Sequence, residues 1–167
     1  LFVLAVASLL WLLHRQELEE QHTGLISDTL WVEQNLRFQL SRSQEQLQQL
    51  GQDYFSGDIP ARRFEPRIKS LLLNNPGIIQ VFVLDEGGTA LGGGPGPIGE
   101  AIAGEGLRPE PSQQAFRLAR STGNPVFSAN YSSGGEWRFD IIVPHFRDGQ
   151  HLGSIVAAYS VKTLLAE

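Results

Sequence analysis

The sequence predicts an α+β fold in which a long N-terminal helix packs on an antiparallel sheet. From Glu17 to Leu50 the chain has no proline and a single glycine, Gly24, and its apolar residues recur at helical spacing. The last third of the chain instead reads as three consecutive strands separated by turn residues. Helices and strands that are segregated in this way are typical of a sheet with helices packed beside it.

The first thirteen residues, LFVLAVASLLWLL, are uncharged and almost wholly apolar. A helix of this length spans about 20 Å, whereas a bilayer core needs roughly 20 apolar residues. We therefore expect residues 1–14 to be the end of a transmembrane helix and the chain, which has no methionine, to be a fragment of a longer protein. A cleaved signal peptide is the alternative, but HRQELEEQ continues in helical register without a small-residue cleavage site.

Composition narrows the class of protein further. The chain has no cysteine, so it has neither a disulfide framework nor a thiolate metal site. Its net charge of −5 argues against nucleic-acid binding, which uses basic surfaces. Glu17, Glu19 and Glu20 follow the apolar segment where a cytoplasmic flank would carry lysine and arginine. We therefore expect the domain to face away from the cytoplasm.

Residues 15–50 are expected to form one long amphipathic helix, ended by Gly51 and Pro60. The apolar positions of one ridge are Leu18, Leu25, Val32, Leu36, Leu40, Leu47 and Leu50. A second ridge carries Ile26, Leu30 and Phe38. The helix either only covers its own domain or also pairs with a second copy, and the second ridge favours a homodimer through this helix.

The middle of the chain is expected to hold two short helices, one strand and a loop. A helix over residues 64–73 precedes the buried strand IIQVFVLDEGG. Residues 87–106 hold half of the glycines and read as a flexible loop. PSQQAFRLARSTG then predicts a helix, with Ser112 as its N-terminal cap and Gly123 at its end.

Three strands are expected at the end of the chain: PVFSANY, EWRFDIIVPHF and LGSIVAAYSV. The turn between the last two is Asp148-Gly149, which is typical of a tight hairpin. The middle strand alternates, so its two faces differ. We expect Trp137, Phe139, Ile141 and Val143 to face the core against the long helix, with Arg138, Asp140 and Ile142 on the other face.

These pieces resemble extracytoplasmic PAS-like sensor domains of the Cache type, which occur in bacterial sensor histidine kinases and chemoreceptors. The resemblance lies in IIQVFVLDEGG, GNPVFSANY and FDIIVPHFRDGQHLGSIVAAYSVKTLL. The segment DTLWVEQNLRFQLSRSQEQLQQL is similar to the N-terminal signalling helix of such receptors. The resemblance implies a PAS/Cache-like domain over residues 51–167, with VKTLLAE leading toward a second membrane helix.

By this resemblance the parent is a membrane-bound two-component sensor histidine kinase of the bacterial inner membrane, with this domain in the periplasm. A chemoreceptor or a diguanylate cyclase is an alternative parent. A domain without a small ligand, which answers to a periplasmic protein partner, is another alternative. The fragment contains no phosphoacceptor helix or nucleotide-binding motif, so we expect it to carry no catalytic residue and to need no cofactor.

PAS-like sensors enclose a small ligand between one face of the sheet and the loops above it, and such a pocket needs aromatic walls with a few polar anchors. The candidate ligand-binding residues are Phe127, Tyr131, Arg138, Asp140 and Tyr159, of which Tyr159 belongs either to the pocket wall or to the core. Arg138 can bind a carboxylate through two hydrogen bonds, and Asp140 on the same face can bind an ammonium group. An amino acid or a small organic acid would suit this pair, whereas the alternative is an Arg138–Asp140 salt bridge on a solvated face.

Other site chemistry has weaker support in the sequence. GPGPIG matches a dinucleotide-binding fingerprint, but Pro95 and Pro97 lack the N–H groups that would hold phosphate. A nucleophile elbow is absent. His145, Asp148 and His151 bracket the hairpin turn and are weak candidates for a zinc site or a pH sensor.

Overall fold

The computed structural model describes residues 31–94 and 109–166. The expected membrane segment 1–14, the first half of the long helix and residues 95–108 of the glycine-rich segment lie outside these ranges. The chain divides into two units, residues 1–40 and residues 41–167. Within the described ranges no helix is long and apolar enough to span a membrane.

The first helix occupies residues 31–55 of the described chain. In the unit that starts at Ser41, its buried positions are Ser43, Leu47, Leu50 and Gly51, which recur every three or four residues. The helix therefore continues past Gly51, where the sequence predicted its end. It stops before Gly57, whose φ of 80° is left-handed and whose N–H bonds to Tyr54 O at 3.2 Å.

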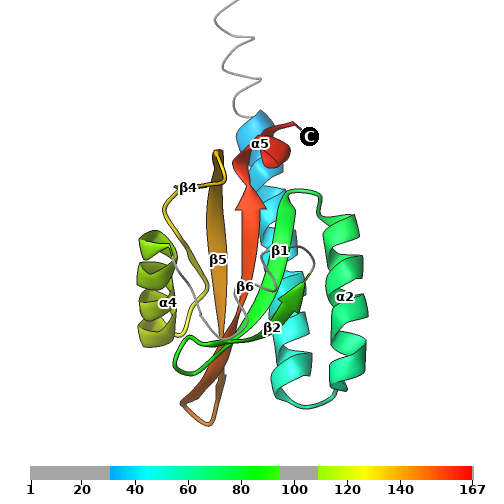
Figure 1. Cartoon of the computed structure of the whole chain (residues 1–167), viewed down its shortest axis with the longest axis vertical. Helices are drawn as coiled ribbons and strands as arrows, with labels where there is room; N and C mark the ends of the chain where they lie inside the picture. The colour runs from blue at the N-terminus through cyan, green and yellow to red at the C-terminus, as the bar shows by residue number, and fades with distance from the viewer. Residues whose placement is uncertain (1–30, 95–108, 167) are drawn as a thin grey trace, which may run out of the picture. The chain divides into compact units, whose positions relative to one another are not determined.

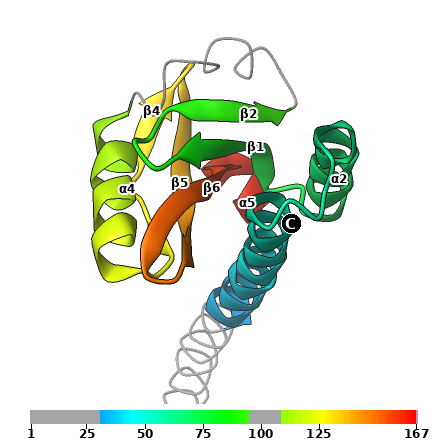
Figure 2. The same ribbon diagram turned by 90° about the horizontal axis from the view of Figure 1, so that it is seen from below.

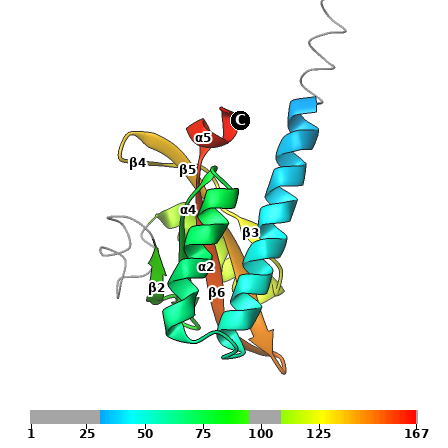
Figure 3. The same cartoon turned by 90° about the vertical axis from the view of Figure 1, so that its right-hand side faces the viewer.

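The second helix, α2 (Ala61–Asn74), confirms the short helix expected over residues 64–73. Phe64, Ile68 and Leu71 are its buried positions. Within the second unit, Figures 2 and 3 show α2 lying beside the C-terminal part of the first helix. Asn75 Nδ2, just after α2, donates to Gln46 Oε1 at 2.8 Å, and Arg67 forms an ion pair with Asp53.

The sheet of the described chain has six strands and is antiparallel, with the order β2-β1-β6-β5-β3 and with β4 also paired to β5 (Figure 1). The strands are β1 (Ile78–Asp85), β2 (Ala90–Gly94), β3 (Val126–Phe127), β4 (Tyr131–Ser133), β5 (Glu136–Arg147) and β6 (Gln150–Ser160). β2 corrects the expectation of a loop over residues 87–106, because residues 90–94 pair with β1 despite their three glycines. The segment PVFSANY forms two short strands, β3 and β4, instead of one.

Helices cover both faces of this sheet, as Figure 2 shows. One face packs against α4 (Glu110–Thr122), which was expected from PSQQAFRLARSTG. Their shared apolar cluster contains Phe82, Leu84, Ala90, Ala115, Phe116, Ala119, Ile142 and Val156. The other face lies toward α2 and the first helix, and there Tyr159 of β6 donates from its hydroxyl to Ser43 Oγ at 2.9 Å. A short helix, α5 (Val161–Leu165), follows β6.

The structure tests the residues that were predicted to end helix α4 and to form the β5–β6 turn. Gly123 has the left-handed φ of 71° that was expected after α4, and its N–H bonds to Ala119 O at 2.9 Å. Asp148 and Gly149, with φ of 51° and 78°, form the predicted tight turn between β5 and β6. Ser112 does not cap α4, since Pro109 occupies the cap position and Ser112 is buried one turn further on.

Trp137 also departs from the sequence-based expectation. Ile141 and Val143 are buried as expected, but Trp137 is 61% exposed. It pairs with Ser132 in the β4–β5 hairpin, near the start of the long strand. Alternation assigns Trp137 to the same face of the strand as Ile141 and Val143, but it does not indicate how deeply a side chain on that face is buried.

Candidate ligand site beside strand β5

Asp140 is the centre of a polar cluster on the face of the sheet that packs against α4. Its side chain is only 2% exposed. Ser112 Oγ of α4 donates to Asp140 Oδ2 at 2.5 Å, and the Tyr131 hydroxyl of β4 donates to Oδ1 at 2.7 Å. The carboxylate is therefore held by hydroxyl groups from two elements that lie far apart in the sequence.

Ser128, in the connection between β3 and β4, fixes the backbone of Asp140. Its N–H donates to Asp140 O at 2.8 Å, and its Oγ accepts from Asp140 N at 2.8 Å. This exchange continues the strand pairing past the two residues of β3. As a result, the backbone of β5 is anchored at the residue that carries the buried carboxylate.

Arg138 lies two residues before Asp140 on the same face of β5 and directly opposite Tyr131 on β4. Its side chain is 16% exposed, and its Nη2 is 3.9 Å from Glu136 Oε2. Its Nε is buried and has no hydrogen-bond partner in the described residues. A guanidinium that is mostly buried with one unused donor is suited to binding a carboxylate.

Burial changes the acid–base behaviour of this cluster. It raises the pKa of Asp140 above the usual range for a carboxyl group, against the opposing hydrogen bonds from Ser112 and Tyr131 and the positive charge of Arg138. Burial, together with the charge of Asp140, raises the pKa of the Tyr131 hydroxyl. Tyr131 is therefore a hydrogen-bond donor at all physiological pH values.

The structure separates the five candidate residues into two groups. Tyr131, Arg138 and Asp140 lie together on the α4 face. Phe127 pairs with Ile141, which places Phe127 on the opposite face, where its ring centroid is 6.1 Å from that of Phe139. Tyr159 is on that face too, 1% exposed and stacked on Phe139 at 4.9 Å. The role of all five residues in ligand binding stays a prediction.

The three weak metal candidates do not converge. His145 lies against the first helix, where its ring centroid is 5.3 Å from that of Phe55. His151 instead contacts Phe116 of α4 and Phe146, and Asp148 lies in the exposed hairpin turn. In the described residues no group of three potential ligands could hold a metal ion.

Sequence reasoning missed Ser112 and Ser128 as members of the cluster. The burial of Ser112 could have been predicted, because Ser112 lies on the same side of the helix as Ala115, Phe116 and Ala119, which are buried. A serine on an apolar stripe needs a buried partner. Ser128 had no such signal, because its role depends on how the connection between β3 and β4 folds back on β5.

No protein-family model and no curated protein sequence matches the chain. Solved structures do match its fold. One is the ligand-binding domain of the Pseudomonas aeruginosa amino acid chemoreceptor PctB in complex with L-Gln, with 19% identity and a TM-score of 0.59 over 80% of this chain and 53% of that one. Another is the extracellular domain of mmHK1S-Z2, a proposed histidine kinase, with 18% identity and a TM-score of 0.57 over 79% of this chain and 57% of that one.

A third match is an extracellular ligand binding receptor from Desulfohalobium retbaense, with 17% identity and a TM-score of 0.53 over 79% of this chain and 26% of that one. The chain thus spans between about a quarter and just over half of the length of these structures. The likeness confirms the expected fold, an α+β Cache-like domain with an N-terminal helix packed on an antiparallel sheet.

Proposed function

We propose that this chain is the extracytoplasmic sensor domain of a membrane-bound receptor and that it binds a small amino acid or organic acid beside β5. The fold supports this proposal, because it is the fold of extracellular ligand-binding domains of chemoreceptors and histidine kinases. The observation that carries the proposal is the cluster of Asp140, Tyr131 and Arg138, which combines an acceptor, a donor and a cation on one face of the sheet.

The cluster can hold the two ends of a zwitterion. The Arg138 guanidinium has an unused buried Nε donor for a carboxylate. Asp140 can accept from an ammonium group if the ligand displaces the Ser112 or Tyr131 hydroxyl that now bonds to it. Exchanging a neutral donor for a charged one strengthens the hydrogen bond to the carboxylate.

Strand β5 also connects the proposed ligand site to the first helix. Phe139 lies between Arg138 and Asp140 but points to the opposite face, where it stacks on Tyr159. Tyr159 in turn donates to Ser43 of the first helix. A ligand that shifts β5 would therefore move the contact with the helix, and moving a two-state equilibrium from 1:99 to 99:1 requires about 5.5 kcal/mol of differential affinity.

The parent that we propose is a bacterial two-component sensor histidine kinase in the inner membrane, with a chemoreceptor or a diguanylate cyclase as the alternative. In this layout residues 1–14 belong to a transmembrane helix, residues 15–50 to the signalling helix that forms a homodimer, and residues 51–167 to the periplasmic sensor domain. The apolar start of the chain and the exposed Phe38 support the anchor and the dimer respectively.

The experiment is a thermal-shift screen of the full chain in detergent micelles against amino acids and small organic acids. A ligand at 100 times its dissociation constant stabilises the fold by about 2.7 kcal/mol. We expect a saturable shift that Arg138→Ala abolishes and that Asp140→Asn weakens for amino acids only. Arg63→Ala, at an exposed position on α2, is the matched control and should leave the shift unchanged.

A domain that binds a protein partner without a small ligand is the second candidate. It is favoured by one observation: protein hydroxyls already satisfy both oxygens of Asp140. If no compound shifts the melting temperature, or if Arg138→Ala responds like the unmodified chain, the ligand proposal is wrong and this second function takes its place.

A further inference from the structure

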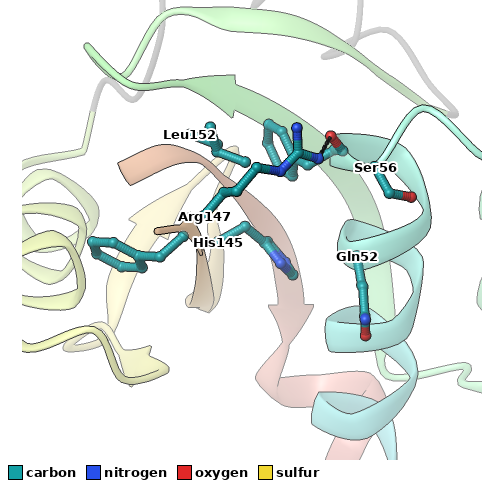
Figure 4. A pocket seen from close by; sticks show the side chains of 7 residues that line it. Gln52, Ser56, His145, Arg147 and Leu152 are labelled. Atoms are coloured by element: carbon teal, nitrogen blue, oxygen red, sulfur yellow. Dashed lines mark hydrogen bonds between the residues drawn. The ribbon is translucent and has the colours of Figure 1, made fainter. Parts of the chain in front are cut away.

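We propose that a second, separate site binds a small monocarboxylate with an apolar body, in the cavity between the end of the first helix and the β5–β6 hairpin. The cavity has a volume of about 250 Å³. It is lined by Gln52, Phe55, Ser56, His145, Phe146, Arg147 and Leu152 (Figure 4). None of these residues belongs to the cluster around Asp140, so this site does not rest on the function proposed above.

Arg147 gives the cavity its positive charge. Figure 4 shows its guanidinium reaching toward the end of the helix, where Nη2 donates to Phe55 O at 2.9 Å. This is its single hydrogen bond in the described residues, and no carboxylate there lies within ion-pair distance of it. No acidic residue lines the cavity; Asp58 accepts from Ser56 Oγ at 2.6 Å but is not part of the wall. The remaining N–H groups of Arg147 can therefore bind an anion.

His145 adds no charge to this wall at neutral pH. Burial lowers the pKa of its imidazole to about 4, with a smaller contribution from the charge of His151. Its Nε2 is buried against Gly51 and has no partner in the described residues. The cavity thus offers one positive charge, which suits an anion with one negative charge.

The rest of the wall mixes polar groups with apolar side chains that can contact the body of the ligand. Phe55, Phe146 and Leu152 supply aromatic and aliphatic surface, and Gln52 and Ser56 supply one amide and one hydroxyl. Ligand pockets usually combine such apolar walls with a few polar groups. The volume is below the usual range for drug-sized ligands, roughly 300–1,000 Å³, so the ligand is small.

Benzoate is a suitable probe, because it combines one carboxylate with one ring. We expect it to bind the full chain in detergent micelles with saturation, and to shift the amide resonances of residues 52–56 and 145–152 in ¹⁵N–¹H NMR spectra. Benzamide, which has the same shape without the charge, and inorganic phosphate, which has no apolar body, should each bind at least tenfold more weakly.

Two variants test the site in different ways. Arg147→Gln removes the cation and should weaken benzoate binding at least tenfold, whereas Arg63→Gln on α2 should change the affinity less than twofold. Leu152→Phe keeps the cation but fills the cavity, and it should also weaken binding at least tenfold. Resonance shifts confined to these residues also distinguish this site from the one beside Asp140.

Several results would overturn the assignment. One is the absence of saturable benzoate binding, and another is an unchanged affinity in Arg147→Gln or in Leu152→Phe. Resonance shifts centred on β4 and α4 would place the benzoate at the other site. Phosphate binding as tight as benzoate binding would show that the apolar wall does not contribute.

Discussion

Gly51 and His145 pack so closely that the helix has no room for a side chain at position 51. A Cβ atom added at Gly51 would lie 1.9 Å from His145 Nε2 and 2.5 Å from Cε1. We predict that Gly51→Ala lowers the free energy of unfolding, because the strain of overpacking, about 1–3 kcal/mol, exceeds the gain in helix propensity, about 1 kcal/mol. Urea unfolding of the two chains measures this difference.

A double-mutant cycle is the control for this prediction. In a chain that already carries His145→Ala, the same Gly51→Ala change meets no imidazole and should become stabilising. A similar loss of stability in both backgrounds would show that the imidazole is not what excludes a side chain at position 51.

His145 should also make the stability of the domain depend on pH. Its pKa is about 4 in the folded protein and about 6.5 in an unfolded chain. As the pH falls from 7 to 5, the unfolded state binds more protons than the folded state, so the free energy of unfolding decreases. The decrease is at most about 1.4 kcal/mol per pH unit, and partial solvent access makes it smaller.

The measurement is urea unfolding at pH 7 and at pH 5, with His145→Gln as the variant. Glutamine does not titrate, so the variant should lose less stability over this interval even if it is less stable at pH 7. His151, whose pKa is also lowered, leaves a residual slope in both chains. If the free energy of unfolding fell equally with pH in the two chains, His145 would not be buried as a neutral group.

At the scale of elements, α4 is joined to the sheet by an apolar cluster and by the hydrogen bond from Ser112 to Asp140. Ser112→Ala leaves a buried carboxylate oxygen without this donor, and we predict a loss of about 1–3 kcal/mol in the free energy of unfolding. Ser121→Ala is the matched control on the same helix, because Ser121 is exposed and donates only to Leu118 O. Thermal or urea unfolding measures both variants. If Ser112→Ala and Ser121→Ala lowered the free energy of unfolding equally, the hydrogen bond from Ser112 to Asp140 would not contribute to stability.

The elements also show what the sequence could and could not predict. Helix α4, strand β6 and the Asp148-Gly149 turn follow from local patterns, and they were expected in these places. The strand at residues 90–94 was missed because glycine has low strand propensity. Its pairing with β1 is a contact between two strands that the local sequence pattern does not indicate. The sequence predicted that the helix ends at Gly51, because glycine is common after helices. In the structure the lack of a side chain at Gly51 instead makes room for His145, which lies far away in the sequence.

On the scale of the whole molecule, the question is whether two copies pair through the first helix. Trp31 and Phe38 are each 67% exposed and are seven residues apart, so they lie on one side of the helix. We predict that the full chain in micelles is a dimer by sedimentation equilibrium, and that Trp31→Ser with Phe38→Ser shifts it toward the monomer. Leu73→Ser, at a 75% exposed position on α2, should have no effect. A monomer at all concentrations would contradict the proposed dimer.

The candidate site, too, could be predicted from the sequence only in part. Alternation along β5 placed Arg138 and Asp140 on one face correctly, and Tyr131 joined them through β4. Phe127 and Tyr159 lie on the other face. The register of a strand as short as β3 cannot be read from its sequence, and for Tyr159 the sequence did not decide between pocket wall and core. The cavity beside Arg147 combines residues 52–56 with residues 145–152, and no local pattern predicts that contact.

The two borders of the sheet have a consequence for how the protein behaves at high concentration. One border is β2, whose sequence is ALGGG, and the other includes β3, which has two residues. Beyond Val143, β5 has no outer neighbour in the described chain, and Pro144 has no N–H to offer there. Exposed strand edges are what other chains use as templates for fibrils. Because the edges in the described chain are this short and this poor in β-forming residues, we expect them to be poor templates, so that the domain does not aggregate through its sheet at high concentration.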